Sequence, residues 1–190
     1  MKGNRVRVTR TALLTFAMAL GATLSPGSAP SESAAGEYEV KAAFLLNFAR
    51  LVEWPEDAFP DAHSPLTVGL LSAAPSSESE RIQKFLAGKS VGSRKVQVQQ
   101  IESAEEVGGF HLVFVGASSG AEAGEVAGAT GGGPVLLVGE SDGFANEGGA
   151  INFFTVGNKI RFEINPRAAE AAGLRVSSRL LRVAKIISDG

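Results

Sequence analysis

Three short runs of almost uninterrupted apolar residues constrain the fold of this chain most strongly. They are Leu66 to Leu71 (LTVGLL), His111 to Val115 (HLVFV) and Pro134 to Val138 (PVLLV). Runs of this kind are typical of strands that are buried on both faces of a parallel sheet. Segments with helical spacing lie between them, at Ser77 to Ala87 and Ser119 to Ala129. This alternation predicts an α/β fold with a largely parallel central sheet covered by helices on both faces.

Further strands are expected at the borders of this sheet. Lys95 to Ile101 has a partly alternating pattern, which indicates an edge strand or a strand with one solvated face. Ala150 to Val156 and Lys159 to Ile164 are separated by Gly157 and Asn158, and two residues of turn type predict a tight antiparallel hairpin added to the sheet. Along the second arm Lys159, Arg161 and Glu163 share a face, which is therefore expected to meet solvent or a ligand.

Helices are predicted at both ends of the domain. The first covers Glu37 to Val52, with Val40, Phe44 and Phe48 at helical spacing on the apolar side. Its polar side is expected to carry Lys41, Asn47 and Arg50. Asn165 and Pro166 form a cap and first turn for a helix that runs through Ala172 and stops at Gly173. A final helix is predicted from Ser177 to Ile187, with Leu180, Leu181, Val183, Ala184 and Ile187 toward the sheet.

The N-terminus has the pattern of a secretory signal peptide. Lys2, Arg5, Arg7 and Arg10 precede an apolar stretch of about 14 residues, Thr11 to Leu24, which is shorter than the roughly 18 needed to span a bilayer. Ser33 and Ala35 are small residues at the −3 and −1 positions before Gly36. We therefore expect residues 1–35 to be a cleaved signal peptide and small-residue tract, and residues 36–190 to form a single domain.

Composition narrows the classes of function. The chain has no cysteine, which excludes disulfides, thiol nucleophiles and cysteine-based zinc sites. The net charge of −2 argues against a strongly basic nucleic-acid surface. Paired histidines are lacking and two nearby acids seldom suffice for a dedicated metal site, so no metal or cofactor is expected.

Motifs of catalysis are incomplete. Gly116 to Gly120 fits the nucleophile-elbow pattern G-x-S-x-G with Ser118 at its centre, but His63 and His111 both precede the serine, whereas a hydrolase of this type places its histidine after it. Gly88-Lys89-Ser90 lacks the first glycine of a phosphate-binding loop and follows a helix rather than a strand. A serine hydrolase remains an alternative that labelling with a fluorophosphonate probe would test.

Several side chains are candidates for binding. Glu140 and Asp142 follow a buried strand, and the carboxyl ends of parallel strands are where open α/β sheets bind ligands. Arginines at positions 50, 161 and 179 could converge on an anion, although scattered arginines are more often solvated. Trp54 and Phe59 could stack on a ligand, or the tryptophan could close the core beneath the first helix.

Three blocks of sequence together resemble the YfiR-like family of exported proteins. They are Val40 to Arg50 with Glu53 to Pro55, Val138 to Ala145 with Gly148 to Phe153, and Ala172 to Leu181. The resemblance implies a periplasmic α/β regulator without an enzymatic site, one that binds the periplasmic domain of an inner-membrane diguanylate cyclase or sensor kinase. It implies repression of the cyclase, lower cyclic-di-GMP and less biofilm, and it also implies a homodimer and a small aromatic or nucleotide-like ligand. The lack of cysteine departs from the redox control known in the family.

The candidate surface for a ligand or partner combines residues of all three blocks. It consists of Asn47, Arg50, Glu53, Trp54, Glu140, Asp142 and Arg179. The alternative is a periplasmic small-molecule binding protein that has no obligate protein partner.

Overall fold

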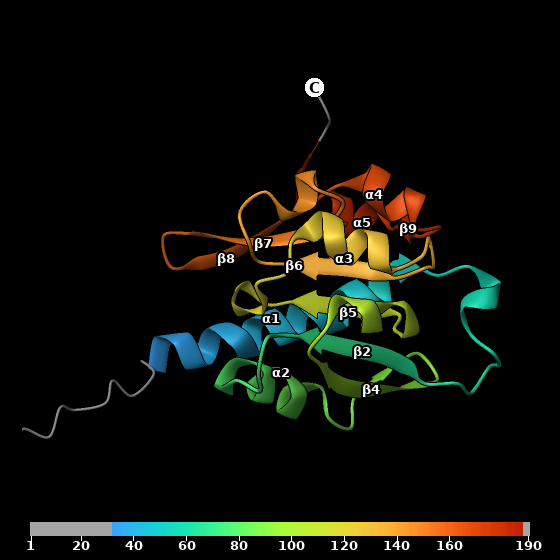
Figure 1. Cartoon of the computed structure of the whole chain (residues 1–190), viewed down its shortest axis with the longest axis horizontal. Coiled ribbons are helices and arrows are strands. Elements are labelled where there is room, and N and C mark those ends of the chain that lie inside the picture. The colour runs from blue at the N-terminus through green and yellow to red at the C-terminus, as the bar shows by residue number, and fades with distance from the viewer. Residues whose placement is uncertain (1–31, 188–190) are drawn as a thin grey trace, which may run out of the picture.

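The computed structural model describes residues 32–187. Residues 1–31 of the expected signal peptide lie outside this range, and the expected cleavage site before Gly36 falls within the first helix, α1 (Glu32–Leu51). The core of the fold is a sheet of eight strands in the order β10-β8-β7-β6-β5-β2-β4-β3 (Figure 1). Five consecutive strands run parallel to one another: β4 (Arg94–Ile101), β2 (Leu66–Leu71), β5 (Leu112–Val115), β6 (Leu136–Gly139) and β7 (Ile151–Val156). The predicted α/β class with a largely parallel sheet is confirmed.

The sheet ends in antiparallel or short strands at both borders. β8 (Lys159–Ile164) pairs antiparallel with β7 through the predicted two-residue turn, and β10 (Lys185–Ile186) pairs parallel with the far end of β8. At the opposite border β3 (Ser90–Val91) forms a small hairpin with β4. A separate two-stranded pairing joins β1 (Val52–Glu53) to β9 (Arg175–Val176).

Helices cover both faces, as the side chains of β5 illustrate. Leu112 and Phe114 point into the core that contains α1 (Glu32–Leu51) and α2 (Ser77–Leu86), whereas Val113 and Val115 point into the core beneath α3 (Ala123–Ala129). Successive strand residues face opposite sides of a sheet, so a central strand needs apolar residues at every position. The short helices η2 (Ala104–Gly109) and η4 (Phe144–Asn146) complete the α3 side, while α4 (Pro166–Ala171), α5 (Ser178–Leu181), η1 (Glu56–Ala58) and η3 (Ala117–Ser119) lie in connections.

The predicted orientation of the first helix is partly wrong. Val40, expected in the core, is 45% exposed, and Lys41, expected on the polar side, is only 5% exposed. Phe48 is fully buried and packs against Phe153 and Phe162 of the hairpin, with ring centroids 5.6 and 5.0 Å apart. The helix is rotated so that the Lys41 side chain points into the protein, because its Nζ forms a hydrogen bond to the buried carboxylate of Glu140.

The predicted final helix from Ser177 to Ile187 is also wrong. Only the single turn α5 is helical, and Lys185 and Ile186 instead extend the sheet beside β8. Val183, expected toward the sheet, is 67% exposed. Pairing with an open sheet edge overrides the helical spacing of this segment.

The second hairpin arm departs from its expected pattern at one residue. Glu163 was expected on an open face with Lys159 and Arg161, but it is 8% exposed. It accepts a hydrogen bond from Lys185 Nζ at 2.8 Å and one from Asn152 Nδ2 at 3.4 Å. The face is therefore open at the hairpin tip and closed where β10 pairs.

Candidate functional site

The loop that follows β6 is shaped by one aromatic ring. Phe144 is 2% exposed and packs against the backbone of Gly139 and Gly149, where an added Cβ would lie 2.3 and 2.2 Å from the ring. Gly143 begins this turn with φ +82°, a conformation that L side chains rarely adopt. The loop therefore leaves the sheet sharply and fixes Glu140 at the carboxyl end of β6.

Glu140 is the centre of a buried polar cluster at this edge of the sheet. Its Oε2 accepts a hydrogen bond from Lys41 Nζ at 2.6 Å, and its Oε1 accepts one from the backbone N–H of Ala117 at 2.9 Å and a longer one from Tyr38 Oη at 3.5 Å. The Glu140 and Lys41 side chains are 7% and 6% exposed. Lys41 Nζ also lies 2.6 Å from Glu37 Oε1, one helical turn earlier. The cluster joins α1 to the loops after β5 and β6.

The surroundings of Lys41 and Tyr38 in this cluster raise the pKa of both side chains. Burial disfavours the Lys41 ammonium, but its hydrogen bonds to Glu140 and Glu37 outweigh that effect, so the pKa of Lys41 is raised. Burial, and next the negative charge of Glu140, raise the pKa of Tyr38 well above its ordinary value. Near neutral pH the cluster therefore holds a protonated lysine and a neutral tyrosine.

The cluster fills the place where an open α/β sheet would bind a ligand. The hollow there has a volume of only about 10 Å³ and is lined by residues that include Leu70, Ser72, Gly116, Ser118 and Glu140. That is about the room for one water molecule. Ser118 makes no hydrogen bond to a histidine within residues 32–187. The arrangement ties elements together rather than presenting a cleft for a substrate.

The seven residues of the predicted surface fall into two groups. Glu140 contacts Lys41 in the N-terminal half of α1, and Asp142 is exposed two residues further along the same loop. The others lie in or near the C-terminal half of α1, beginning with Asn47, which is six residues or about 9 Å along the helix from Lys41, and continuing past the end of the helix at Leu51. The structure therefore does not join all seven in one site.

Each residue of the second group has a distinct setting. The second group comprises Asn47, Arg50, Glu53, Trp54 and Arg179, of which Asn47 and Arg179 are simply exposed. Arg50 donates to the carbonyl of Ser90 at 3.3 Å, and Glu53 forms an exposed ion pair with Arg175 at 2.7 Å. Trp54 is half-buried and donates its indole N–H to the carbonyl of His111 at 3.3 Å. This tryptophan therefore helps to close the fold, which was one of its two expected roles.

The loop after β1 is held against the sheet by the stacked side chains of Arg94, Phe59 and His111, an arrangement that the sequence did not indicate. The ring of Phe59 stacks on His111 with centroids 4.2 Å apart, and the Arg94 guanidinium lies 3.7 Å from the Phe59 ring centroid. His111 Nε2 donates to the carbonyl of Ala58 at 3.0 Å, and the N–H of Thr67 donates to Nδ1 at 3.1 Å. Burial lowers the pKa of His111, and the nearby positive charge of Arg94 acts in the same direction.

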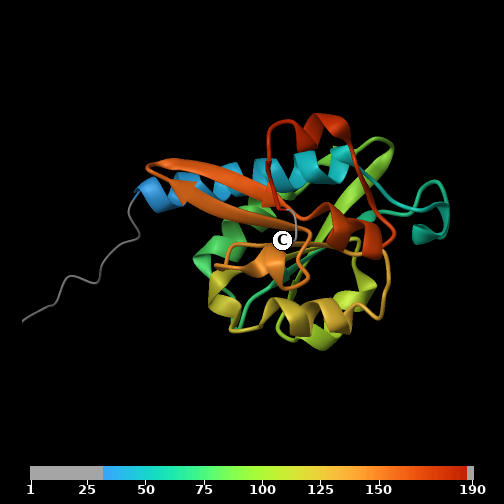
Figure 2. The same ribbon diagram turned by 90° about the horizontal axis from the view of Figure 1, so that it is seen from above.

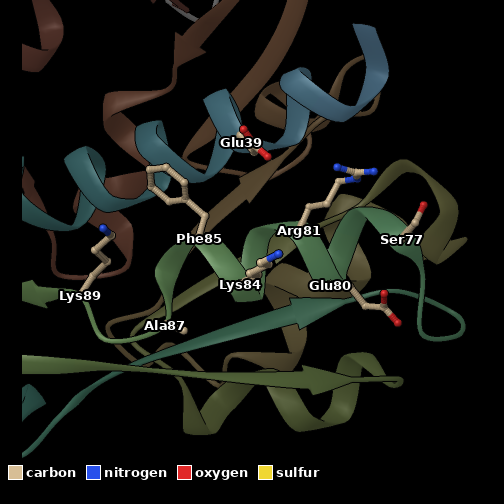
Figure 3. Close-up of a pocket in the computed structure, with 8 residues that line it drawn as sticks. All are labelled: Glu39, Ser77, Glu80, Arg81, Lys84, Phe85, Ala87 and Lys89. Carbon is tan, nitrogen blue, oxygen red and sulfur yellow. The ribbon is translucent and has the colours of Figure 1, made fainter. Parts of the chain in front are cut away.

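Two open grooves border α1. The first, of about 600 Å³, lies between α1 and α2, and Figure 3 shows Arg81, Lys84 and Phe85 of α2 together with Glu39 of α1 around it. The second, of about 670 Å³, lies between the N-terminal half of α1 and the β7–β8 hairpin. Volumes of this size match those of ligand pockets, although both grooves are open to solvent.

The described part of the chain has neither a metal-binding cluster nor a membrane-spanning helix. Within 32–187, no three or more His, Cys, Asp and Glu side chains are grouped so that they could hold a metal ion. None of the helices in this range has both the length and the apolar character needed to cross a membrane.

Comparisons with known proteins identify a family that matches the sequence and solved structures with a similar fold. Residues 38–185 match the model of the DUF4154 family, described as YfiR/HmsC-like. A search of curated proteins finds no match. Similar solved structures include the ABC domain from Streptococcus pneumoniae in complex with L-Trp (TM-score 0.53, 12% identity) and a conserved domain protein from Vibrio cholerae O1 biovar El Tor (TM-score 0.54, 11% identity). The matches cover 77% and 80% of this chain but only 60% of each of those chains, so they support the fold alone.

Proposed function

Because the chain belongs to the YfiR/HmsC-like family, we propose that it is a non-enzymatic regulatory protein of the periplasm. In this proposal residues 1–35 direct export and are removed, and residues 36–190 form one regulatory domain that acts as a homodimer. The protein binds the periplasmic domain of an inner-membrane diguanylate cyclase or sensor kinase. Repression of a cyclase would lower cyclic-di-GMP and biofilm formation.

The observation that carries this proposal is the family match, which covers 148 of the 190 residues, from 38 to 185. The structure supports it through what occupies the carboxyl edge of the sheet. Glu140 and Lys41 fill that position with a buried ion pair and leave a hollow of about 10 Å³. A domain that acts by contact with another protein does not need a substrate cleft there.

Regulation across the membrane would follow from differential affinity. A protein that binds one conformational state of a sensor domain shifts that domain toward the bound state, and only by the difference in affinity for the two states. The exposed residues at the C-terminal end of α1, Asn47 and Arg50, are our first candidates for the contact. Glu140 would act indirectly by fixing α1.

The test is a measurement of cyclic-di-GMP in cells. Deletion of the gene is expected to raise cyclic-di-GMP, and the wild-type gene to restore it. Arg50→Glu reverses an exposed charge on α1 and is expected to restore it incompletely, whereas Glu125→Lys, a reversal of an exposed charge on α3 at the other face of the sheet, is expected to restore it fully. Unchanged cyclic-di-GMP after deletion would exclude regulation of a cyclase. A pull-down from detergent-solubilised membranes would then show whether a sensor kinase is recovered instead.

A second candidate function is suggested by the groove between α1 and α2. Phe85 is half-buried there, and Arg81 and Lys84 have no ion pair among the described residues (Figure 3). This combination suits a small aromatic or nucleotide-like anion. Native mass spectrometry of protein purified from cells would detect such a ligand, and Phe85→Ala would weaken its binding.

A further inference from the structure

The tip of the β7–β8 hairpin carries a strand edge that no neighbouring strand covers. The hairpin extends beyond the other strands alongside the N-terminal half of α1 (Figures 1 and 2). β10 pairs with β8 only at Glu163 and Ile164. The segment from Lys159 to Phe162 therefore has no strand on its outer side within the part of the chain that the structure describes.

The register shows which backbone groups face outward. Val156 and Lys159 face each other across the two-residue turn and close the hairpin, and hydrogen-bonded pairs then alternate along it. Ile160 and Phe162 consequently direct backbone groups away from β7. The same alternation reaches Ile164, whose carbonyl accepts an outer hydrogen bond from the N–H of Ile187 at 2.8 Å. Unpaired groups of this kind are a template for another strand.

An apolar surface lies on the α1 side of this edge. The groove of about 670 Å³ is lined there by Val40, Phe44 and Ile160, and Val40 is 45% exposed. Phe44 contacts Phe162 with ring centroids 5.4 Å apart, so the base of the groove is the core itself. A strand laid along β8 would bring alternate side chains against this surface.

Two positively charged residues of β8 also border this groove. Lys159 and Arg161 are exposed and form no ion pair within residues 32–187. The remaining charged residue of the groove, Glu37, lies 2.6 Å from Lys41. The charges left without a partner at this edge are therefore both basic.

We propose that the outer edge of β8 docks an extended segment of a partner protein in which acidic and apolar residues alternate. The apolar side chains pack against Val40 and Ile160, and the acidic ones face Lys159 and Arg161. This inference rests on the proposed function, because it identifies the surface by which a regulatory domain would hold its partner.

A second copy of this chain is a poorer occupant of the edge. Two β8 edges that paired with each other would bring Lys159 and Arg161 of both copies together. Like charges at facing positions destabilise a strand pair, and edge lysines are a common protection against such self-pairing. The same charges favour an acidic strand.

The test uses the purified protein and synthetic peptides, with no cyclase present. The probe is a fluorescent ten-residue peptide of alternating valine and glutamate, and its counterpart has lysine in place of glutamate. We expect the acidic peptide to raise fluorescence anisotropy and to shift the backbone amide resonances of residues 159–162, and the basic peptide to do neither. Lys159→Glu with Arg161→Glu is expected to weaken binding about tenfold or more, and Lys95→Glu less than about twofold.

A further variant tests the backbone contribution. Ile160→Pro removes an outward N–H that is not used in pairing with β7, and it should abolish binding while circular dichroism shows an intact fold. Equal binding by the charge-reversed protein, amide shifts elsewhere, or no binding of the acidic peptide would overturn the proposal. So would a dimer in sedimentation that Ile160→Pro dissociates. Cyclic-di-GMP in cells is read independently, so failure here is distinct from failure of the proposed function.

Discussion

Because Lys41 and Glu140 form a buried ion pair, substitutions of the two residues should have strongly non-additive effects on the free energy of unfolding. Lys41→Met removes the ammonium and leaves the Glu140 carboxylate, which is 7% exposed, with the Ala117 N–H as its remaining close donor. Loss of one partner of a buried pair costs about 3–5 kcal/mol, and the Ala117 hydrogen bond places this variant near about 3 kcal/mol. Glu140→Gln should cost less, about 2 kcal/mol, because Lys41 keeps Glu37 at 2.6 Å.

The double variant distinguishes a coupled pair from two independent residues. With both charges removed, no buried charge is left without a partner, and the cost should remain near about 2 kcal/mol rather than reach the sum of the singles. The coupling energy would then be about 2–3 kcal/mol, far above the roughly 0.5 kcal/mol within which independent sites add.

Urea unfolding at pH 7 measures these free energies, and the chain offers its own probe and control. Trp54 is the only tryptophan and is half-buried, so its fluorescence reports unfolding. Glu80 and Lys84 have i,i+4 spacing on α2 but are exposed, and the same substitutions there should couple by less than about 0.5 kcal/mol. A Lys41–Glu140 coupling as small as that of the control pair would refute the assignment of α1 anchoring to this ion pair.

Three further predictions use other parts of the structure. Burial lowers the pKa of His111, so as the pH falls below about 6.5 the unfolded chain binds a proton before the folded protein does. The free energy of unfolding should therefore decrease from about pH 6.5 down to the lower pKa of the folded state. In the same urea assay, His111→Gln should show a smaller decrease in this free energy between pH 7 and pH 5 than the wild type. Gly139→Ala would place its Cβ 2.3 Å from the Phe144 ring and should lower the melting temperature strongly, whereas Gly128→Ala in α3 has open space and should leave it equal or higher. Tyr38 is the only tyrosine and its pKa is raised, so its absorbance change should begin at a higher pH in the folded protein than in urea. The free energy of unfolding should fall as the pH rises through about 10, because the unfolded chain then loses the tyrosine proton first. Titration at the same pH in both states would contradict the burial of Tyr38 beside the cluster.

The sequence was sufficient for the sheet because the strand signal is local. Runs such as Leu112 to Val115 are apolar at each position, and this pattern is typical of a strand covered on both faces. The hairpin turn at Gly157 and Asn158 and the cap at Asn165 were likewise predictable, since their chemistry lies within a few residues; Asn165 Oδ1 accepts from the N–H groups of Arg167 and Ala168.

The candidate site was only partly predictable because its contacts join distant segments. Glu140 was identified from its place after a strand, but its partner Lys41 lies 99 residues earlier and was assigned to the solvent side of the helix. The one local signal was the i,i+4 spacing of Glu37 and Lys41, which equally suits an exposed pair. The final helix was predicted wrongly for the same reason. The spacing of apolar residues from Ser177 to Ile187 gives no sign that the edge of β8, distant in the sequence, is open to pairing with Lys185 and Ile186.

The pairing of β1 with β9 has a consequence for how the chain folds as it emerges. Val52 faces Val176, so this pairing at the C-terminal end of α1 cannot form until almost the whole chain is available. The apolar side of that helix, including Leu45 and Phe48, is buried partly by residues beyond position 150. A chain delivered from its N-terminus would therefore leave part of the apolar side of this helix uncovered until the residues beyond position 150 arrive, which makes it a target for a holding chaperone during synthesis or translocation.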